Sequence, residues 1–302
     1  MLEPGALRGK VEAATRRAGE SGALAPLPTR SHIVEDGGLR FLVRILTSRD
    51  HKARARLEQD RASALYGVEP NPFLPYDPDL YVAELSPTHV GLLNKYKVLD
   101  HHLLLVTRGF EEQEEALNLD DFMAMWACMA EYEGLAFYNA GEVGGASQRH
   151  KHLQFVPLPL DSREPRLPVE AALASARLDG PMGAAPGLPF AHLMVRIDPA
   201  WLRSPRAAAR ATLDPYLAML DALGLLGQGG CSPRPHNLLV TREWMLVVAR
   251  ARPDHAGIGV NALGFVGALL VRDQDQLDML RARGPMSLLR AVAVPPGPVR
   301  GS

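Results

Sequence analysis

The sequence is poor in cysteine and has no long apolar run, and both absences exclude classes of protein. Only two of the 302 residues are cysteine, Cys128 and Cys231, and they lie far apart in the chain. Such a pair makes neither a disulfide framework nor a Cys-x-x-Cys metal site, so we expect a reducing, cytoplasmic environment. No stretch approaches the roughly 20 apolar residues of a membrane-spanning helix, and the N-terminal residues lack the apolar segment of a secretory signal. We therefore expect no membrane partner.

An excess of charge of either sign is also missing. The chain has 33 Lys and Arg residues against 34 Asp and Glu residues, which gives a formal net charge of -1. Without a net positive charge, no overall field attracts nucleic acid, and we expect no nucleic-acid partner. An anionic ligand must therefore be held by a local site. Hydrophobic residues make up 47% of the chain, which is enough for a substantial core.

The apolar pattern predicts antiparallel strands mixed with separate helices. Three strand-like runs, at residues 80–85, 89–96 and 101–108, are joined by short connections, and short connections favour antiparallel neighbours. Strands and helices do not alternate regularly, so we expect an α+β fold. Further strands are expected at 39–46, 136–142, 152–159, 192–197 and 262–272, two more over 236–251, and helices within 1–30, 118–134, 204–226 and 274–284.

A polar cluster stands at the start of one expected strand, in the stretch GGASQRHKHLQFVPLP (residues 144–159). On an extended strand residues i and i+2 point the same way, so His150, His152 and Gln154 share one face. Three polar groups on one face are costly unless they meet a ligand or each other. The glycines just upstream allow backbone N–H groups to converge on an anion. Because neutral imidazole is a good nucleophile, the cluster favours covalent attack on phosphorus, with the second ring nitrogen held by a backbone carbonyl.

Two other interpretations of these histidines stay open on the pattern alone. Histidines at i and i+2 can bind a metal ion, although no acidic or cysteine ligand nearby completes the set. They can also be structural histidines at the protein surface. We predict no metal site.

The wider sequence resembles one known family. The residues HKHLQ (150–154) match the His-x-His-x-Gln motif of the transferase branch of the histidine-triad (HIT) superfamily. Longer blocks closely resemble the diadenosine tetraphosphate phosphorylases, also called ATP adenylyltransferases, over roughly residues 35–280. These blocks are NPFLPYD (71–77), HVGLLNKYKV (89–98), HHLLLVTRGFEEQEEAL (101–117), FYNAGEVGGASQRHKHLQFVPLP (137–159), HNLLVTREWM (236–245) and NALGFVGALLV (261–271).

The resemblance implies both a fold and a reaction. The fold would be HIT-like, with antiparallel sheets flanked by helices in two related halves. In the reaction, diadenosine tetraphosphate (Ap4A) and phosphate give ADP and ATP, reversibly. His152 would attack the α-phosphorus of an adenylyl unit, ATP would leave, and phosphate would then take the AMP from the ring. By the same resemblance His150 orients the site and Gln154 donates a hydrogen bond to the AMP phosphate.

The resemblance also assigns further residues to the nucleotide site. The turn from Gly145 to Gln148 corresponds to the family's phosphate cradle, and Arg272 lies where the family tends to carry lysine. Two departures stand out: Arg149 replaces a frequent proline and could reach a phosphate, and Ala268 replaces a bulkier residue, which would enlarge the nucleoside pocket. We expect no tightly bound cofactor, with a divalent cation such as Mg²⁺ assisting through the polyphosphate. The complete set of expected binding residues is Lys52, Asn94, Lys95, Asn139, Gly145, Ala146, Ser147, Gln148, Asn261, Ala262, Leu263 and Arg272.

Four segments follow from the resemblance and the composition. They are an N-terminal helical or loop extension (1–30), a HIT-like catalytic half (31–160), a Pro/Gly/Ala-rich excursion (161–190) and a C-terminal half that completes the nucleotide site (191–302).

Other functions remain to be separated from Ap4A phosphorolysis. A nucleotide-sugar uridylyltransferase shares the motif, but that family places a proline between the histidines, where this chain has Lys151, and its cysteine zinc ligands are missing here. Adenylyl transfer that uses sulfate is a second alternative. A sensor that binds dinucleoside polyphosphates without turnover is a third, and the intact His152 and Gln154 argue against it.

Overall fold

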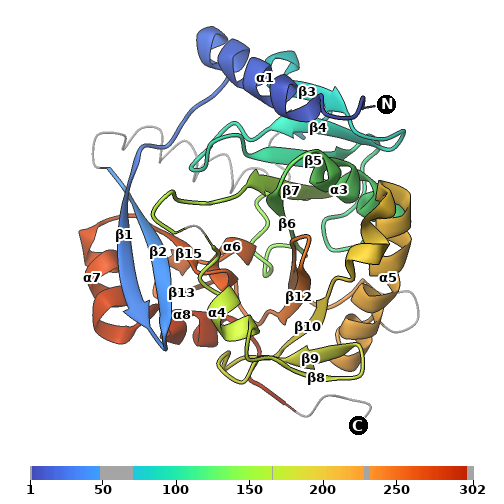
Figure 1. Ribbon diagram of the computed structural model, residues 1–302. Coiled ribbons are helices and arrows are strands. Elements are labelled where there is room, and N and C mark those ends of the chain that lie inside the picture. Colours follow the sequence, from blue (N-terminus) through green and yellow to red (C-terminus); the bar gives the residue numbers. More distant parts are fainter. Residues whose placement is uncertain (1, 48–70, 165, 228–231, 298–302) are drawn as a thin grey trace.

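A ten-stranded sheet crosses the whole molecule (Figure 1). The computed structural model describes residues 2–47, 71–164, 166–227 and 232–297. Every neighbouring pair of strands in this sheet is antiparallel, as the short connections predict. In spatial order the strands are β3 (Tyr81–Glu84), β4 (His89–Leu93), β5 (Leu103–Thr107), β7 (His152–Pro157), β6 (Gly134–Asn139), β11 (His236–Val240), β12 (Trp244–Ala249), β10 (His192–Arg196), β9 (Met182–Ala184) and β8 (Arg177–Asp179).

Three helices cover one face of this sheet. They are α1 (Leu7–Ser21), α3 (Leu119–Glu131) and α5 (Pro205–Ala222), and their apolar faces share one core with Leu153 and Phe155 of β7. The helix α3 begins where its sequence predicts, because Asn118 and Asp121 form a reciprocal capping box. The helix α5 begins at Ser204, whose hydroxyl accepts from the backbone of Ala207. The predicted α+β architecture is therefore confirmed.

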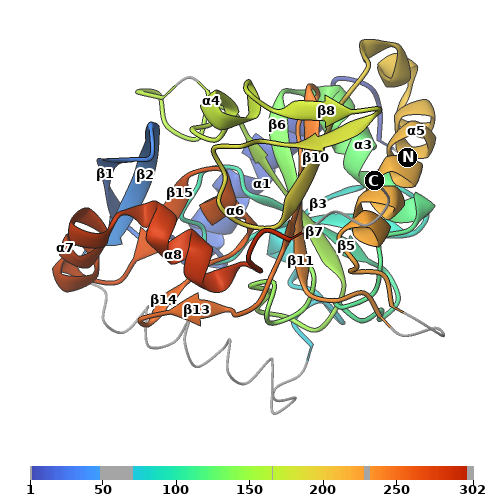
Figure 2. The ribbon, with the colours of Figure 1, turned by 90° about the horizontal axis from the view of Figure 1, so that it is seen from below.

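The opposite face carries a second layer, which Figure 2 shows on the side away from α3 and α5. In a small sheet, β15 (Ala268–Val271) lies parallel to β2 (Leu39–Leu46), so a C-terminal segment completes an N-terminal hairpin. The other elements of this layer are β1 (Thr29–Asp36), α4 (Glu170–Leu173), α6 (Ala262–Phe265), α7 (Gln274–Arg283), α8 (Pro285–Val292), β13 (Asp254–His255) and β14 (Ile258–Gly259). Two short 3₁₀ helices, Pro78–Leu80 and Pro199–Arg203, complete the described elements.

Several segments differ from the sequence prediction, among them α8 and the β13–β14 pair, which lie outside every expected element. The expectation of one strand over 262–272 is wrong for its first part, because the Asn261 side chain caps a short helix, α6, before β15 begins. The strand β1 was not predicted, although the Asp-Gly-Gly turn at 36–38 is a hairpin signal. The excursion over 161–190 contains α4 and the hairpin β8–β9, which extends the large sheet at its edge. In the described part of the chain, no helix is both long and apolar enough to cross a membrane.

The second face of the sheet is not uniformly apolar, and this positions the site. One apolar cluster, around Phe73, Val90 and Val106, covers strands β4 and β5 on this face. Another covers β6, β12 and their neighbours beneath the small sheet. The polar side chains of β7 lie between the two clusters. Strand β6 pairs with β11, so the large sheet continues from the first predicted half into the second.

Candidate active site

His152 is the first residue of β7, and its ring has one engaged and one free nitrogen. Its Nδ1 lies 2.8 Å from the carbonyl oxygen of His150, and because a carbonyl can only accept, Nδ1 carries the proton. The lone pair is therefore on Nε2, for which the described residues offer no hydrogen-bond partner. Burial lowers the pKa of His152 to about 4, against the effect of the His150 carbonyl. At neutral pH this ring is therefore uncharged, and its role as the nucleophile stays a prediction.

His150 is held by both ring nitrogens and so acts as a support. Its Nε2 donates to the carbonyls of Thr107 and Gly109, at 2.8 Å and 3.0 Å. Its Nδ1 accepts from the side-chain amide of Asn71 at 2.8 Å. Burial lowers its pKa as well, which favours this neutral state. With both nitrogens engaged, His150 has no lone pair to offer a substrate, and its contribution is to fix the carbonyl that orients the His152 ring.

Gln154 receives its orientation from a histidine whose role the sequence did not reveal. The Nε2 of His102 donates to Gln154 Oε1 at 2.8 Å, and the Asn94 amide lies 3.3 Å from His102 Nδ1. Burial lowers the pKa of His102 to about 4, so the neutral ring keeps this donor and acceptor assignment. The Gln154 Nε2 is then directed away from His102, and nothing in the described ranges accepts its protons. The structure thus links predicted residue Asn94 to Gln154 through His102.

The glycine-rich turn ahead of β7 lies against the second half of the chain. Gly145 has φ +94°, and a Cβ there would lie 2.7 Å from the Val260 carbonyl oxygen, so only glycine fits. The N–H groups of Gly145 and Ala146 donate to the carbonyls of Glu142 and Gly141 within the turn. These two N–H groups are therefore engaged within the turn, and the assignment of Gly145 and Ala146 to the nucleotide site stays a prediction. Those of Ser147 and Gln148 have no partner among the residues described, and they remain as donors.

Asn139, at the end of β6, joins this turn to the Asn261–Leu263 segment. Its Oδ1 accepts from the Ala262 backbone N–H and from the Asn237 amide, both at 2.9 Å. Asn261 Oδ1 accepts from the Leu263 backbone N–H and caps α6. The structure therefore brings Asn139, Asn261 and Ala262 together as predicted, but it engages the Ala262 N–H and the cap oxygen internally. The Nδ2 of Asn139 keeps a free donor with respect to the described part of the chain.

A buried arginine that the sequence analysis did not select lies directly behind the turn. Arg250 is 3% exposed, and its Nη1 bonds the Gly144 carbonyl at 3.0 Å and Asn237 Oδ1 at 2.7 Å. Its Nη2 bonds the Val260 carbonyl at 2.8 Å. Burial lowers its pKa to about 10, so it stays charged at neutral pH. No carboxylate among the described residues pairs with it, which leaves an uncompensated positive charge next to the proposed anion site.

Comparison with known proteins finds two matching domain families that together cover most of the chain. The Ap4A phosphorylase N-terminal domain family matches residues 1–175, and the ATP adenylyltransferase C-terminal domain family matches residues 186–295. The chain belongs to the Ap4A phosphorylase family. Diadenosine 5',5'''-P1,P4-tetraphosphate phosphorylase 2 of Saccharomyces cerevisiae is 28% identical over 242 residues, which is 70% of this chain and 71% of the yeast protein.

Solved structures agree on the fold. The crystal structure of a yeast Ap4A phosphorylase superposes with a TM-score of 0.79 at 23% identity, covering 100% of this chain and 98% of the yeast chain. The same yeast enzyme in complex with Ap4A gives a TM-score of 0.78 at 21% identity, covering 98% and 99%. These likenesses establish that the chain has the fold of the Ap4A phosphorylases.

Not every residue assigned from the Ap4A phosphorylase resemblance is brought to His152. Lys52 lies outside the described residues. Arg149 does not point a free cation at the site, because its Nη2 lies 2.6 Å from Glu112 Oε1. The Lys95 ammonium lies 5.5 Å from the centre of the Tyr96 ring. Arg272 is exposed beyond the end of β15 in the small sheet, and its role in the nucleotide site stays a prediction.

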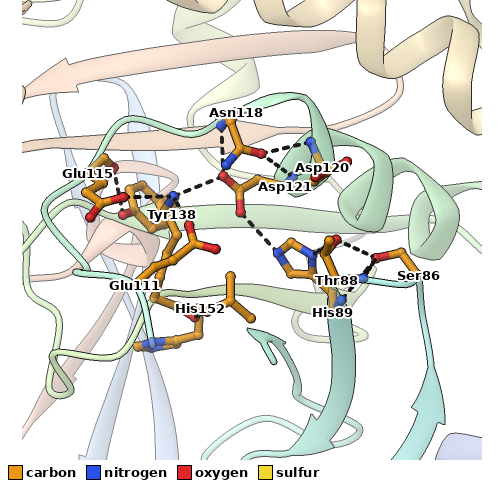
Figure 3. A network of polar contacts seen from close by, with 12 residues as sticks. Ser86, Thr88, His89, Glu111, Glu115, Asn118, Asp120, Asp121, Tyr138 and His152 are labelled. Carbon is orange, nitrogen blue, oxygen red and sulfur yellow. Dashed lines mark hydrogen bonds and ion pairs between the residues drawn. The ribbon is translucent and has the colours of Figure 1, made fainter. Parts of the chain in front are cut away.

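The other face of β7 carries a buried charge network (Figure 3). Lys151 is fully buried, with its Nζ 3.3 Å from Asp121 Oδ2 and 2.9 Å from Glu111 Oε2. Asp121 also accepts from His89 Nε2 at 3.0 Å. Although burial lowers the pKa of Lys151, the Asp121 and Glu111 carboxylates raise it overall, so the ammonium stays charged. This network ties the start of β7, next to His152, to the start of α3.

Proposed function

We propose that this chain catalyses the reversible phosphorolysis of Ap4A to ADP and ATP through an AMP group held covalently on His152 Nε2. The single observation that supports this most directly is the His152 ring, with Nδ1–H bound to the His150 carbonyl and the Nε2 lone pair free. Membership of the Ap4A phosphorylase family supplies the substrate class. Splitting one displacement into two allows one polyphosphate to be exchanged for another at the same phosphorus.

In the first step the Nε2 lone pair forms a bond to the α-phosphorus of one adenylyl unit. The bond from that phosphorus to the bridging oxygen breaks, and its electron pair leaves with ATP. In the second step an oxygen of inorganic phosphate attacks the same phosphorus. The N–P bond breaks, its electron pair returns to Nε2, and ADP leaves, so the ring regains its starting state.

The surrounding donors suit the charge that develops during both steps. The Gln154 Nε2 and the N–H groups of Ser147 and Gln148 have no acceptor among the described residues. Donors of this kind stabilise the negative charge on the phosphoryl oxygens in the transition state of an in-line displacement. The Arg250 cation behind the turn adds a positive potential at fixed position. Asn139 Nδ2 is a further donor. It lies at the end of β6, the neighbour of β7 on the side of the second half of the chain.

Several predictions about conditions and partners go with this function. We expect Mg²⁺ to act while bound to the polyphosphate, so added Mg²⁺ should raise the rate until the substrate is saturated with the ion. We expect Ap4A, ATP, ADP and phosphate as the small-molecule partners, and a cytoplasmic location. Sulfate as an acceptor is a side reaction to be measured beside phosphate.

The test is to mix the protein with Ap4A in the absence of phosphate and measure its intact mass. The wild-type protein is expected to gain one adenylyl group, and peptide mapping is expected to place it on His152. Adding phosphate should remove it and release ADP. The variant His152→Ala is expected to gain nothing and to lose turnover, while its affinity for Ap4A stays within about tenfold because chemistry rather than binding is removed.

Other results would contradict the proposal in different ways. A uridylyl group taken from a nucleotide sugar would assign the chain to the alternative transferase. Rapid release of free AMP in water alone would indicate a hydrolase. Binding of Ap4A without any covalent adduct, together with unchanged turnover in His152→Ala, would remove the histidine nucleophile altogether.

A further inference from the structure

The side chain of Gln113 enters the large sheet beside the nucleophile. Gln113 lies in the acidic segment between β5 and α3 and is 2% exposed. Its Oε1 accepts from the His152 backbone N–H at 2.8 Å. Its Nε2 donates to the His152 carbonyl at 3.1 Å and to the Asn139 carbonyl at 2.9 Å. One amide group thus contacts the backbones of both β6 and β7.

The pairing of β6 with β7 stops just before this point. The register runs from Gly134 opposite Pro157 to Phe137 opposite Gln154, and its continuation would place Asn139 opposite His152. Each of these two residues still pairs on its outer side, Asn139 with Asn237 and His152 with Val106. At the level of Asn139 and His152, the large sheet therefore keeps its pairing on the two outer sides and lacks it between β6 and β7.

The Gln113 amide takes the place of the missing backbone pair. In an antiparallel ladder, two opposite residues of a bonded pair exchange N–H and C=O groups. Here the amide oxygen accepts from the His152 N–H, and the amide nitrogen donates to the His152 and Asn139 carbonyls, so these three backbone groups keep a partner where the strand pairing has ended. A buried carbonyl or N–H without such a partner would destabilise the fold.

The main chain of Gln113 is held by the same two strands and their extensions. Its N–H donates to the Arg149 carbonyl at 2.8 Å, just ahead of β7. Its carbonyl accepts from the Tyr138 hydroxyl at 2.6 Å, on β6, and from the Gly141 N–H at 3.1 Å. The glutamine therefore cannot shift relative to one strand without straining contacts to the other.

We infer that Gln113 is a positioning residue that holds β6 and β7 apart at the separation the adenylyl group requires. The side chains of Asn139 and His152 lie on the same face of the sheet, because their neighbours Tyr138 and Leu153 both face the opposite core. The opening therefore separates the nucleophile from the Asn139 donor across a gap. This inference rests on the proposed function, because it places the phosphorus that His152 attacks between the ends of these two strands.

The expected consequence is a loss of rate that exceeds any loss of binding. A misplacement of about 1 Å at a reacting group can cost on the order of 100-fold in rate. The variant Gln113→Met keeps the length of the side chain but removes the three hydrogen bonds that the side-chain amide makes. We expect its rate of His152 adenylylation at saturating Ap4A, in a single turnover without phosphate, to fall at least tenfold. The half-saturating Ap4A concentration should change by a smaller factor.

A control is needed for the loss of a buried hydrogen bond as such. Thr212 is fully buried, and its hydroxyl accepts from Trp126 Nε1 at 2.9 Å, between α3 and α5 and away from His152. The variant Thr212→Val removes this bond at similar volume and is expected to lose thermal stability but to adenylylate at the wild-type rate. If Gln113→Met does not fold, Gln113→Asn is measured instead, because its shortened amide cannot reach both strands.

The outcomes separate this inference from the proposed function. A Gln113 variant that reacts within threefold of the wild type, or a Thr212→Val variant that slows equally, would overturn the positioning role while leaving the reaction intact. A wild-type protein that never accepts an adenylyl group would overturn the proposed function, and the inference with it.

Discussion

At the scale of single residues, the chemistry depends on which nitrogen of each ring carries the proton. The His150 carbonyl fixes the His152 proton on Nδ1 and leaves the lone pair of the proposed nucleophile on Nε2. The His102 Nε2–H fixes the Gln154 amide so that its nitrogen is the free donor. Both rings are neutral because they are buried, and neither faces a carboxylate that would favour the charged form. The site therefore carries no histidine charge that a bound polyphosphate would neutralise.

This neutral state leads to a prediction for the pH dependence. A protonated Nε2 has no lone pair, so activity is lost as the pH falls through the pKa of His152, which burial lowers to about 4. The kcat/KM for adenylylation by Ap4A, measured without phosphate, should therefore stay level from pH 7.5 to about 5.5 and decline only below that. Circular dichroism at each pH controls for acid unfolding. A midpoint near 6.5, the value of an exposed histidine, would show that the ring is not held in this desolvated state.

At the scale of elements, the start of α3 has two functions. Asp121 completes the capping box with Asn118. It also forms an ion pair with Lys151, on the face of the sheet opposite His152. The residue between the two histidines is thus a buried anchor, and it fixes the strand on the face opposite the substrate. A proline at this position, which we expected of a nucleotide-sugar uridylyltransferase and not of this chain, could not make this contact.

The anchor predicts a large loss of stability in Lys151→Met. The change leaves Asp121 buried without its cation, and breaking a buried ion pair in this way typically costs about 3–5 kcal/mol. Urea unfolding should show this difference in the free energy of unfolding. The matched control is Lys97→Met, since Lys97 pairs with the exposed Asp100, and a pair of that kind contributes about 1 kcal/mol or less. Equal losses in the two variants would show that the buried network is not an anchor.

At the scale of the whole molecule, the site is built where the two halves of the chain meet. The large sheet passes from β6 to β11, and Asn139 reaches across to Ala262. The Arg250 guanidinium donates hydrogen bonds to the Gly144 and Val260 carbonyls and to the Asn237 side chain. The glycine-rich turn before β7 therefore depends on residues of the second half for its shape.

The coupling between the halves is tested by Arg250→Met. The change leaves several buried acceptors without a donor at about 1–3 kcal/mol each, so a loss of about 3 kcal/mol or more in unfolding free energy is expected. Arg206 on α5 is exposed, and Arg206→Met should stay within about 0.5 kcal/mol of the wild type. A native-like stability of Arg250→Met would show that the turn does not rely on this cation.

The sequence by itself determined most of the elements and the strand face that carries the candidate nucleophile. The alternation of β7 placed His150, His152 and Gln154 on one face, and the capping residues of α3 and α5 fixed where those helices begin. Strand alternation and helix capping both depend on residues that are close together in the sequence, so the sequence alone shows them. The apolar run at 262–271 was misassigned because a short apolar stretch fits a buried helix and a strand equally well.

Only the tertiary structure decided which polar groups the site can offer. His102, Gln113 and Arg250 act on residues that are 52, 39 and 106 positions away in the chain, and no local pattern marks such partners. Other long-range contacts engage groups of residues that the resemblance had placed near the ligand, because Asn139 accepts from the Ala262 N–H and Glu112 pairs with the Arg149 cation. A side chain's chemistry is given by its type, but whether a donor is free or engaged depends on what the fold places within about 3 Å of it.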